Sequence, residues 1–272
     1  MADKVNLKID GIDVSVDKGS TVLDAAKKLD IHIPTLCYHE DLCVAGNCRV
    51  CMVERKGANN LVASCAAPAE EGMEIMTNTL KVRQARRYVV DLLLSEHRED
   101  CTKCYKNNNC ELQSLASDTI ISDYLFMDLV PDKDFTIDQF SPSIIKDDGK
   151  CIRCQRCVRT CTELQHVSAL GVAYKGDEMK ISTFFENPMI DVVCTNCGQC
   201  VNRCPTGALV ERNYIDQVYD AIYDEDTHVV VQTAPAVRVA LGEELGFDVG
   251  ERVTGKMVTA LKRIGFDSVL DT

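Results

Sequence analysis

The sequence has 272 residues, 16 of them cysteine and none tryptophan, and its formal net charge is −12. A hydrophobic content of 46% is typical of globular chains and excludes disorder, whereas the acidic balance disfavours nucleic acid binding. The longest charge-free stretch, 57–69, is too short to span a membrane, and the charged N-terminus has no apolar signal core, so we expect a cytoplasmic protein with reduced thiols. Such thiols usually serve metal binding or redox chemistry rather than disulfides.

The first predicted elements are a β-hairpin and a helix. Apolar and polar residues alternate in 5–9 and again in 12–16, which is typical of two half-buried strands. Ser20 or Thr21 can cap a helix that continues to about residue 29. A cysteine-rich loop comes next, and this order of elements predicts the opening of a β-grasp ferredoxin domain.

The cysteine-rich loop carries the first candidate ligand set. It has the pattern Cys-x10-Cys-x2-Cys-x13-Cys, formed by Cys37, Cys48, Cys51 and Cys65. The pattern suits a [2Fe-2S] cluster with one distant ligand, although plant-type ferredoxins space their ligands differently. Gly46 lets the loop backbone approach the sulfides. The remaining cysteine, Cys43, is interpreted as a small buried residue, with a role as loop ligand in place of Cys48 as the alternative.

A histidine begins the second candidate set, which consists of His97, Cys101, Cys104 and Cys110. Apolar residues between Leu80 and Leu93 recur at helical spacing, so His97 should fall at the end of an amphipathic helix of about 17 residues. A lone histidine there is more often a capping residue, but three cysteines without a fourth favour ligation of a [4Fe-4S] cluster. A neutral imidazole in place of a thiolate should favour the reduced cluster. Zinc held by the same four residues is the alternative.

A four-cysteine run then occurs twice, first as Cys151, Cys154, Cys157 and Cys161, and again as Cys194, Cys197, Cys200 and Cys204. In bacterial two-cluster ferredoxins with this spacing, the fourth cysteine of each run ligates the other run's cluster. We therefore assign one [4Fe-4S] cluster to Cys151, Cys154, Cys157 and Cys204, and another to Cys161, Cys194, Cys197 and Cys200. Zinc does not explain eight cysteines in two equal runs. Three arginines lie between the ligands and either offset cluster charge or form a solvated face: Arg153, Arg156 and Arg159.

The residues after Cys204 contain no further cysteine. Strands are predicted at 229–232 and 268–270, and helices at 237–245 and 253–264. A parallel sheet needs cover on both faces, which one such unit cannot supply. We therefore expect an incomplete α/β domain and a chain that is a fragment.

The order of these motifs resembles the N-terminal part shared by [FeFe]-hydrogenases, the large iron–sulfur subunit of respiratory complex I and some NAD-linked formate dehydrogenases. The segments HVVVQTAPAVRVALGEELG and VTGKMVTALKRIGFDSVLDT look like the beginning of the [FeFe]-hydrogenase catalytic domain. In that family the H-cluster is attached through cysteines of later motifs, one of the TSCCP type. None of those motifs is present, so the resemblance implies that this chain holds no catalytic residue and no H-cluster.

The expected fold class is α+β with four domains. Residues 1–78 should form a β-grasp [2Fe-2S] domain, and 79–140 a small domain around the His-ligated [4Fe-4S] cluster. Residues 141–215 should form a two-[4Fe-4S] ferredoxin domain, and 216–272 the incomplete α/β start of the hydrogenase catalytic domain.

The resemblance implies an anaerobic electron-transfer function. The chain would relay single electrons through four clusters between a flavin/NAD(H) partner or ferredoxin and the H-cluster, where H2 and protons interconvert. Expected partners are a flavin- and NAD-binding iron–sulfur subunit and a small [2Fe-2S] subunit, with electron bifurcation where ferredoxin is also used. The alternatives are the accessory part of a formate dehydrogenase or complex-I-like NADH oxidoreductase, and a non-catalytic polyferredoxin carrier.

Overall fold

The computed structural model describes residues 3–119, 125–126 and 135–272. It is a mixed α/β chain that divides into two compact units, Met1–Arg212 and Asn213–Thr272. Residues 120–124 and 127–134, which fall within the expected domain 79–140, lie outside the described residues. The four expected domain boundaries stay predictions.

The predicted hairpin opens a five-stranded sheet. Its strands are β1 (Lys4–Ile9) and β2 (Ile12–Asp17), which pair antiparallel along their whole length. Three short strands complete the sheet in the order β2-β1-β5-β3-β4, and these are β3 (Met52–Arg55), β4 (Leu61–Ala63) and β5 (Glu74–Met76). Only β5 runs parallel to β1, and the other neighbouring strands are antiparallel. The sheet therefore joins strands from both ends of the first eighty residues.

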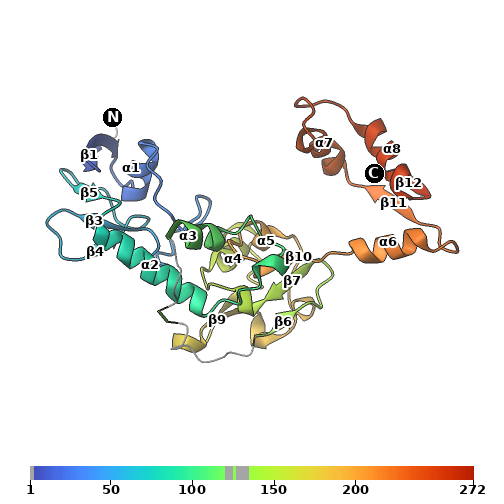
Figure 1. Cartoon of the computed structure of the whole chain (residues 1–272), viewed down its shortest axis with the longest axis horizontal. Coiled ribbons are helices and arrows are strands. Elements are labelled where there is room, and N and C mark those ends of the chain that lie inside the picture. The colour runs from blue at the N-terminus through green and yellow to red at the C-terminus, as the bar shows by residue number, and fades with distance from the viewer. Residues whose placement is uncertain (1–2, 120–124, 127–134) are drawn as a thin grey trace. The chain divides into compact units, whose positions relative to one another are not determined.

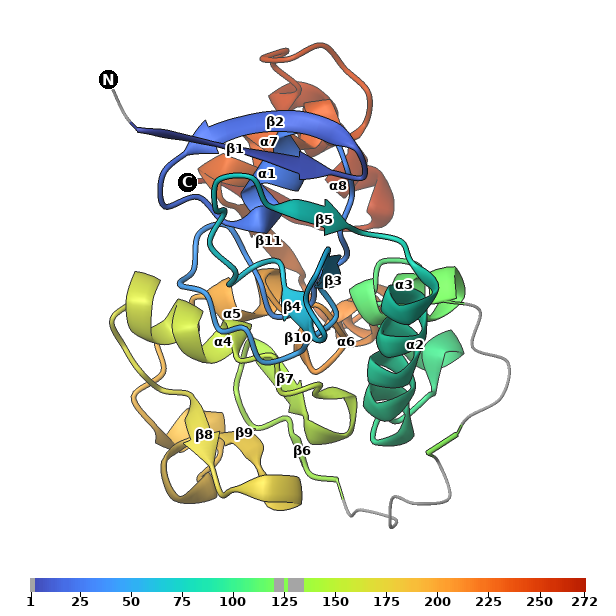
Figure 2. The same ribbon diagram turned by 90° about the vertical axis from the view of Figure 1, so that its left-hand side faces the viewer.

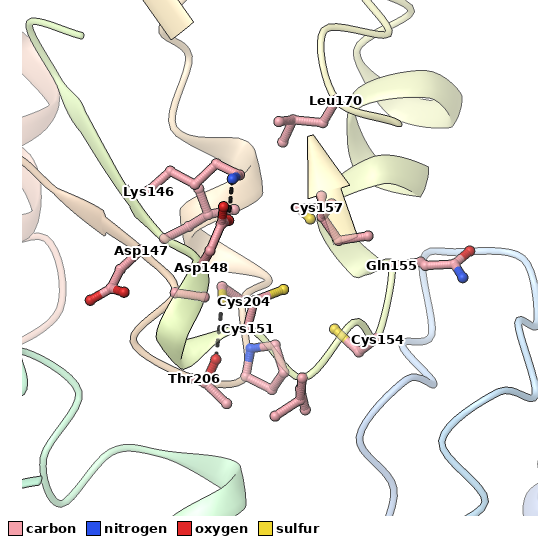
Figure 3. Close-up of a pocket in the computed structure, with 15 residues that line it drawn as sticks. Lys146, Asp147, Asp148, Cys151, Cys154, Gln155, Cys157, Leu170, Cys204 and Thr206 are labelled. Carbon is pink, nitrogen blue, oxygen red and sulfur yellow. Dashed lines mark hydrogen bonds and ion pairs between the residues drawn. The ribbon is translucent and has the colours of Figure 1, made fainter. Parts of the chain in front are cut away.

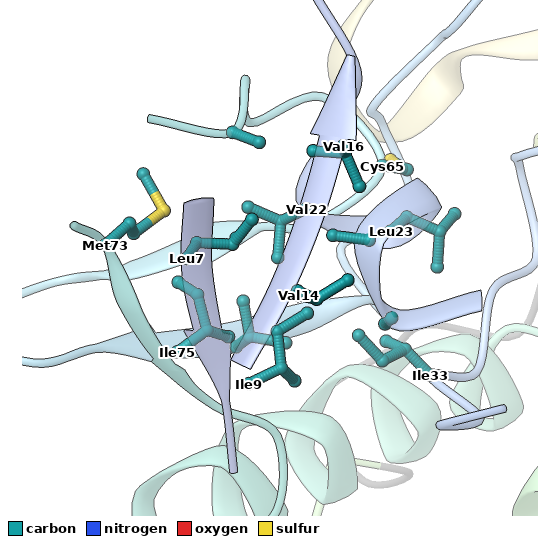
Figure 4. Packing of buried hydrophobic residues seen from close by; sticks show 14 of the residues in the cluster. Leu7, Ile9, Val14, Val16, Val22, Leu23, Ile33, Cys65, Met73 and Ile75 are labelled. Atoms are coloured by element: carbon teal, nitrogen blue, oxygen red, sulfur yellow. The ribbon is translucent and has the colours of Figure 1, made fainter. Parts of the chain in front are cut away.

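Helix α1 (Val22–Lys28) packs against this sheet, beside β1 and β2 (Figure 2). Thr21, and not Ser20, caps it: the Thr21 hydroxyl accepts from the Asp24 amide at 3.2 Å, and the Asp24 carboxylate accepts from the Thr21 amide at 2.9 Å. The inward-facing side chains of the hairpin and the helix form the core of this region (Figure 4). Cys51 and Cys65 belong to the same core, so the first ligand set is anchored on packed apolar structure.

The amphipathic helix predicted before His97 is α2 (Leu80–Ser95), which is capped by Thr79 and lies beside α3 (Glu111–Thr119) (Figure 1). A second core forms where these helices meet the cysteine loops, and it includes Leu36, Val50, Leu112 and Ile152. Cys37 and Cys154 are buried in this second core. Two candidate ligand loops that are far apart in sequence therefore share one packed interior.

The duplicated cysteine runs lie among short elements. A three-stranded sheet has the order β10-β7-β6, from β6 (Ile137–Asp138), β7 (Ile144–Asp147) and β10 (Leu209–Glu211). A two-stranded hairpin consists of β8 (Gly171–Ala173) and β9 (Lys180–Ser182). Two four-residue helices, α4 (Arg156–Arg159) and α5 (Gln199–Asn202), follow the cysteine turns. Because the elements are short, loops rather than long helices or strands carry most of the ligand side chains.

The second unit contains the strands and helices predicted after residue 229. The strands β11 (Val230–Thr233) and β12 (Ser268–Asp271) are parallel, and between them come α7 (Pro235–Glu244) and α8 (Thr254–Ile264). The unit begins with α6 (Ile215–Tyr223), which was not predicted from the sequence. A two-stranded parallel sheet with these helices is the α/β half-domain that the pattern indicates.

Candidate metal centres

The four cysteines of the first set are gathered on one loop system. Cys37, Cys51 and Cys65 are each no more than 1% exposed, and Cys48 is partly buried. The sulfur atoms of Cys51 and Cys65 are 3.3 Å apart, and the Cys37 amide donates to the Cys48 sulfur at 3.4 Å. Hydrogen bonds from Cys48 and Cys65 lower the pKa of Cys37 to about 2, and the bond from Cys65 lowers the pKa of Cys51 to about 6. The donating partners have raised pKa values, so this site holds thiolates readily.

His97 lies just beyond the end of α2, where the helix cap places its ring in the protein interior. Burial first, and then the nearby charge of Lys150, lowers the pKa of His97 to about 4. The imidazole is therefore neutral at pH 7, which is the form that ligates metals. Its buried Nδ1 has no hydrogen-bond partner among the described residues. A buried ring nitrogen without a partner fits a ligand better than a capping residue.

The other members of this set surround the same hollow as the histidine, and its lining includes Cys101, Cys104 and Cys110. Gly207, from the segment after the second cysteine run, also lines it. A Cβ atom at Gly207 would lie 2.5 Å from the Cys104 sulfur, so only glycine fits there without displacement. Gly207 was not predicted as part of this site, because it is distant in sequence from the cysteine that it contacts.

The crossed pattern of the duplicated run appears in two further hollows. Figure 3 shows one, lined by Cys151, Cys154, Cys157 and Cys204. The second is lined by Cys161, Cys194, Cys197 and Cys200. In each case three cysteines of one run meet the fourth cysteine of the other, as the ferredoxin spacing predicts. Ligation itself stays a prediction.

The chemistry of these thiols fits a cluster. Burial raises the pKa of Cys151 to about 11 and those of Cys154 and Cys200 to about 12. Buried thiolates need a positive partner, and coordination to a metal ion deprotonates a thiol outright. Among residues 3–119, 125–126 and 135–272, no three His, Cys, Asp or Glu side chains are grouped to hold a single metal ion. A cluster binds its cysteines at separate iron atoms, so its ligands do not have to meet at one point.

The two runs also share an unusual backbone. Arg153 and Asn196 occupy equivalent positions and both have positive φ, 55° and 54°. Gln155 and Gly198 are likewise equivalent, with φ of 62° and 73°. A short helix begins immediately after each pair. Left-handed residues turn the chain tightly around each set of cysteines, and the sequence repeat is therefore also a structural repeat.

The arginines between the ligands are not a solvated face. Arg156 is 5% exposed and forms a two-pronged ion pair with Glu111, with N···O distances of 2.6 and 2.8 Å. Arg159 is 8% exposed and donates to backbone carbonyl oxygens, and Arg153 pairs with Glu96 at 2.6 Å. The solvated-face alternative is wrong for the two buried arginines, which instead tie the first run to other segments.

The interpretation of Cys43 as a buried residue is also wrong. Cys43 is exposed, and its sulfur lies 2.6 Å from a carboxylate oxygen of Glu163. The same carboxylate accepts from the Cys43 amide at 3.0 Å, and the hydrogen bond to Glu163 raises the pKa of the thiol. The contact connects residues 120 positions apart, so no local pattern indicates it.

Among the described residues, no helix is long and apolar enough to cross a membrane.

Four family models match successive regions of the chain. Residues 2–80 match a 2Fe-2S iron-sulfur cluster binding domain, and 86–123 match the NADH-ubiquinone oxidoreductase-G iron-sulfur binding region. Residues 141–210 match the ferredoxin-like domain of NADH-quinone oxidoreductase subunit 3. Residues 227–272 match the C-terminal domain of the iron only hydrogenase large subunit. The order of these regions is the order of the ligand sets.

Individual relatives agree with the domain models. The chain is 50% identical, over 98% of its length, to the NADP-reducing hydrogenase subunit HndD of Solidesulfovibrio fructosivorans, of which it spans 46%. It is 39% identical to an NADH-quinone oxidoreductase subunit of Rhizobium meliloti and 38% identical to the NADH-ubiquinone oxidoreductase 75 kDa subunit of Reclinomonas americana, each over 77% of the chain. It spans 24% and 30% of those two proteins.

A solved structure extends the comparison to three dimensions. The crystal structure of an NAD+-reducing [NiFe]-hydrogenase in the H2-reduced state matches 76% of this chain and 87% of the solved chain, with a TM-score of 0.70 and 28% identity. The cluster-bearing fold is therefore found in hydrogenases as well as in NADH oxidoreductases. Residues 227–272 distinguish the two groups, since they match an iron-only hydrogenase domain. The chain corresponds to the iron–sulfur N-terminal part of an HndD-like hydrogenase subunit, with complex-I-like domains followed by part of the iron-only hydrogenase C-terminal domain.

Proposed function

We propose that this chain is the electron-transfer portion of an [FeFe]-hydrogenase subunit. It relays single electrons between an external donor or acceptor and the H-cluster of the catalytic domain, for reversible H2 oxidation and proton reduction. The observation that carries the proposal is the succession of four candidate ligand sets followed by a segment that matches the iron-only hydrogenase domain. The NADH oxidoreductase relatives match over 77% of the chain, so they do not account for that last segment.

Four clusters would perform the relay, one [2Fe-2S] and three [4Fe-4S]. We assign the [2Fe-2S] cluster to Cys37, Cys48, Cys51 and Cys65, and the first [4Fe-4S] cluster to His97, Cys101, Cys104 and Cys110. The other two belong to Cys151, Cys154, Cys157 and Cys204, and to Cys161, Cys194, Cys197 and Cys200. Three of the four sets each line one hollow, which supports these groupings.

The finer domain organisation follows these sets. We propose a β-grasp [2Fe-2S] domain at 1–78, a His-ligated cluster domain at 79–140, a two-cluster ferredoxin domain at 141–215 and part of the catalytic domain at 216–272. The mixed five-stranded sheet with α1 packed on it supports the first of these.

The chain's own residues would control the clusters by burial and charge. Each bound cluster supplies a site that gains and loses one electron. Buried cysteines keep water from the ligand sulfurs, and a neutral imidazole at His97 leaves that cluster with one negative charge fewer. Lys150 is 7% exposed, lies near His97 and pairs with Asp100 at 2.9 Å, so it adds a buried positive charge beside the histidine-bearing set.

The proposed partners are a flavin- and NAD-binding iron–sulfur subunit and a small [2Fe-2S] subunit, with ferredoxin as a further donor or acceptor in a bifurcating enzyme. The support is the similarity to a subunit of an NADP-reducing hydrogenase and to a structure of an NAD+-reducing hydrogenase. We place the assembly in the cytoplasm, where thiols stay reduced. NADH should reduce the clusters of this chain only after the flavin subunit is added.

Stepwise reduction tests the function directly. The chain, purified without oxygen, is titrated with dithionite while electron paramagnetic resonance records the reduced clusters. We expect uptake of four electrons, one for each cluster, with one [2Fe-2S] signal among [4Fe-4S] signals. Uptake of fewer than four electrons by iron-replete protein would contradict the proposed relay.

A further inference from the structure

A buried arginine joins two of the proposed ligand loops. Nη2 of Arg159 donates to the carbonyl oxygens of Cys37, at 2.5 Å, and Cys154, at 3.4 Å. Nη1 donates to the carbonyl oxygen of Cys43. Two of these acceptors therefore belong to proposed ligands of different clusters: Cys37 to the [2Fe-2S] cluster, and Cys154 to a [4Fe-4S] cluster.

The charge of Arg159 is balanced differently from those of its neighbours in the run. Arg156 and Arg153 form close ion pairs with Glu111 and Glu96. Among the described residues Arg159 forms no such pair. Glu163 is the nearby acid, but its hydrogen bonds go to the amide and sulfur of Cys43.

We propose that Arg159 is a positioning residue for electron transfer: it holds the [2Fe-2S] ligand loop against a [4Fe-4S] ligand loop and keeps a positive charge between the two clusters. The inference rests on the proposed function, since it requires both clusters. One electron leaves one cluster and arrives at the other, and no proton or bond is exchanged.

The two roles have separate physical bases. A guanidinium is always protonated and presents its donors in a rigid fork, so it can hold several carbonyl oxygens at fixed positions. Lysine keeps the charge, but its single ammonium group cannot reproduce the fork. In a buried site the positive charge is weakly screened, so it favours the addition of an electron to either neighbouring cluster.

Three variants separate charge from geometry. Arg159→Met removes both, whereas Arg159→Lys removes only the fork. Arg153→Met is the matched control, because it removes a charge from the same run while the Arg153 side chain pairs with Glu96. In each anaerobically purified protein, iron content is measured first, followed by the [2Fe-2S] potential and the magnetic coupling between the two reduced clusters.

We expect Arg159→Met to shift the [2Fe-2S] redox equilibrium about tenfold towards the oxidised form, which is about 59 mV for one electron. Arg159→Lys should keep most of the potential but weaken the magnetic coupling, and Arg153→Met should leave both unchanged. Wild-type potential and coupling in an iron-replete Arg159→Met protein would overturn the inference. If that variant does not fold, Arg159→Lys decides, and unchanged coupling in it has the same meaning. A wild-type chain without the two signals would instead contradict the proposed function.

Discussion

At the residue scale, His97 and Gly207 show how the environment of a ligand set is built. The imidazole is kept neutral by burial and by Lys150, and its Nδ1 has no partner among the described residues. The Cys104 sulfur lies against a position where a Cβ atom has no room. One residue therefore adjusts the charge of the proposed cluster and the other its space.

Replacing His97 by cysteine should keep four irons at this site but make the potential more negative. The added thiolate charge opposes reduction, and the effect should be on the order of 100 mV. His97→Ala should lose the cluster or leave it labile. Redox titration of the signals checks the sign, and a more positive potential in the cysteine variant would show that hydration or hydrogen bonding outweighs ligand charge.

Replacing Gly207 by alanine should disturb the same site by overpacking. The new methyl group must displace the Cys104 sulfur, at a cost of about 1–3 kcal/mol, so the His-ligated cluster should become labile. Gly171→Ala is the matched control, because nothing lies within 4 Å of a Cβ atom there. Iron release under mild chelation measures the effect, and equal release from both variants would contradict the steric argument.

Single residues also mark the limit of sequence-based prediction. Spacing groups the proposed cysteine ligands with one another and with His97, because most ligands of one cluster share a loop. It does not indicate Gly207, Lys150 or Arg159, whose contacts join distant segments. Cys43 was interpreted wrongly for the same reason, since its contact with Glu163 spans 120 residues.

At the element scale, the sequence predicts the parts with a clear apolar period. The hairpin, α1, α2 and the elements after residue 229 were expected and are present. The short strands β3 to β10 and the helices α3 and α6 were not expected. Three- or four-residue elements carry too little periodicity, and their positions depend on tertiary contacts and on the cysteine loops.

The capping box of α1 gives a prediction at this scale. Thr21→Ala removes the hydroxyl that accepts from the Asp24 amide, and should cost about 1 kcal/mol of unfolding free energy. Ser20→Ala is the control, with an expected effect within about 0.5 kcal/mol. Denaturant unfolding followed by helical circular dichroism compares them, and equal losses would show that Thr21 is not the cap.

At the scale of the whole molecule, the cysteine inventory limits the chemistry of this chain. Fifteen of the 16 cysteines are assigned to the four sets, and none occurs in residues 205–272. A catalytic H-cluster requires its own cysteine attachment, which leaves the exposed Cys43 as the only unassigned thiol.

The chain of 272 residues should therefore exchange electrons but neither evolve nor oxidise H2. This should hold even after anaerobic incubation with a preformed H-cluster precursor. Gas chromatography with reduced methyl viologen as donor measures the evolution of H2. Turnover by this chain alone would contradict the assignment of its cysteines.

Metal analysis of the anaerobically purified chain is the decisive test of the four-cluster assignment. One [2Fe-2S] and three [4Fe-4S] clusters require about 14 irons per chain and negligible zinc. About 10 irons and one zinc would contradict the assignment at the His97 set, where zinc with three cysteines and one histidine is the alternative.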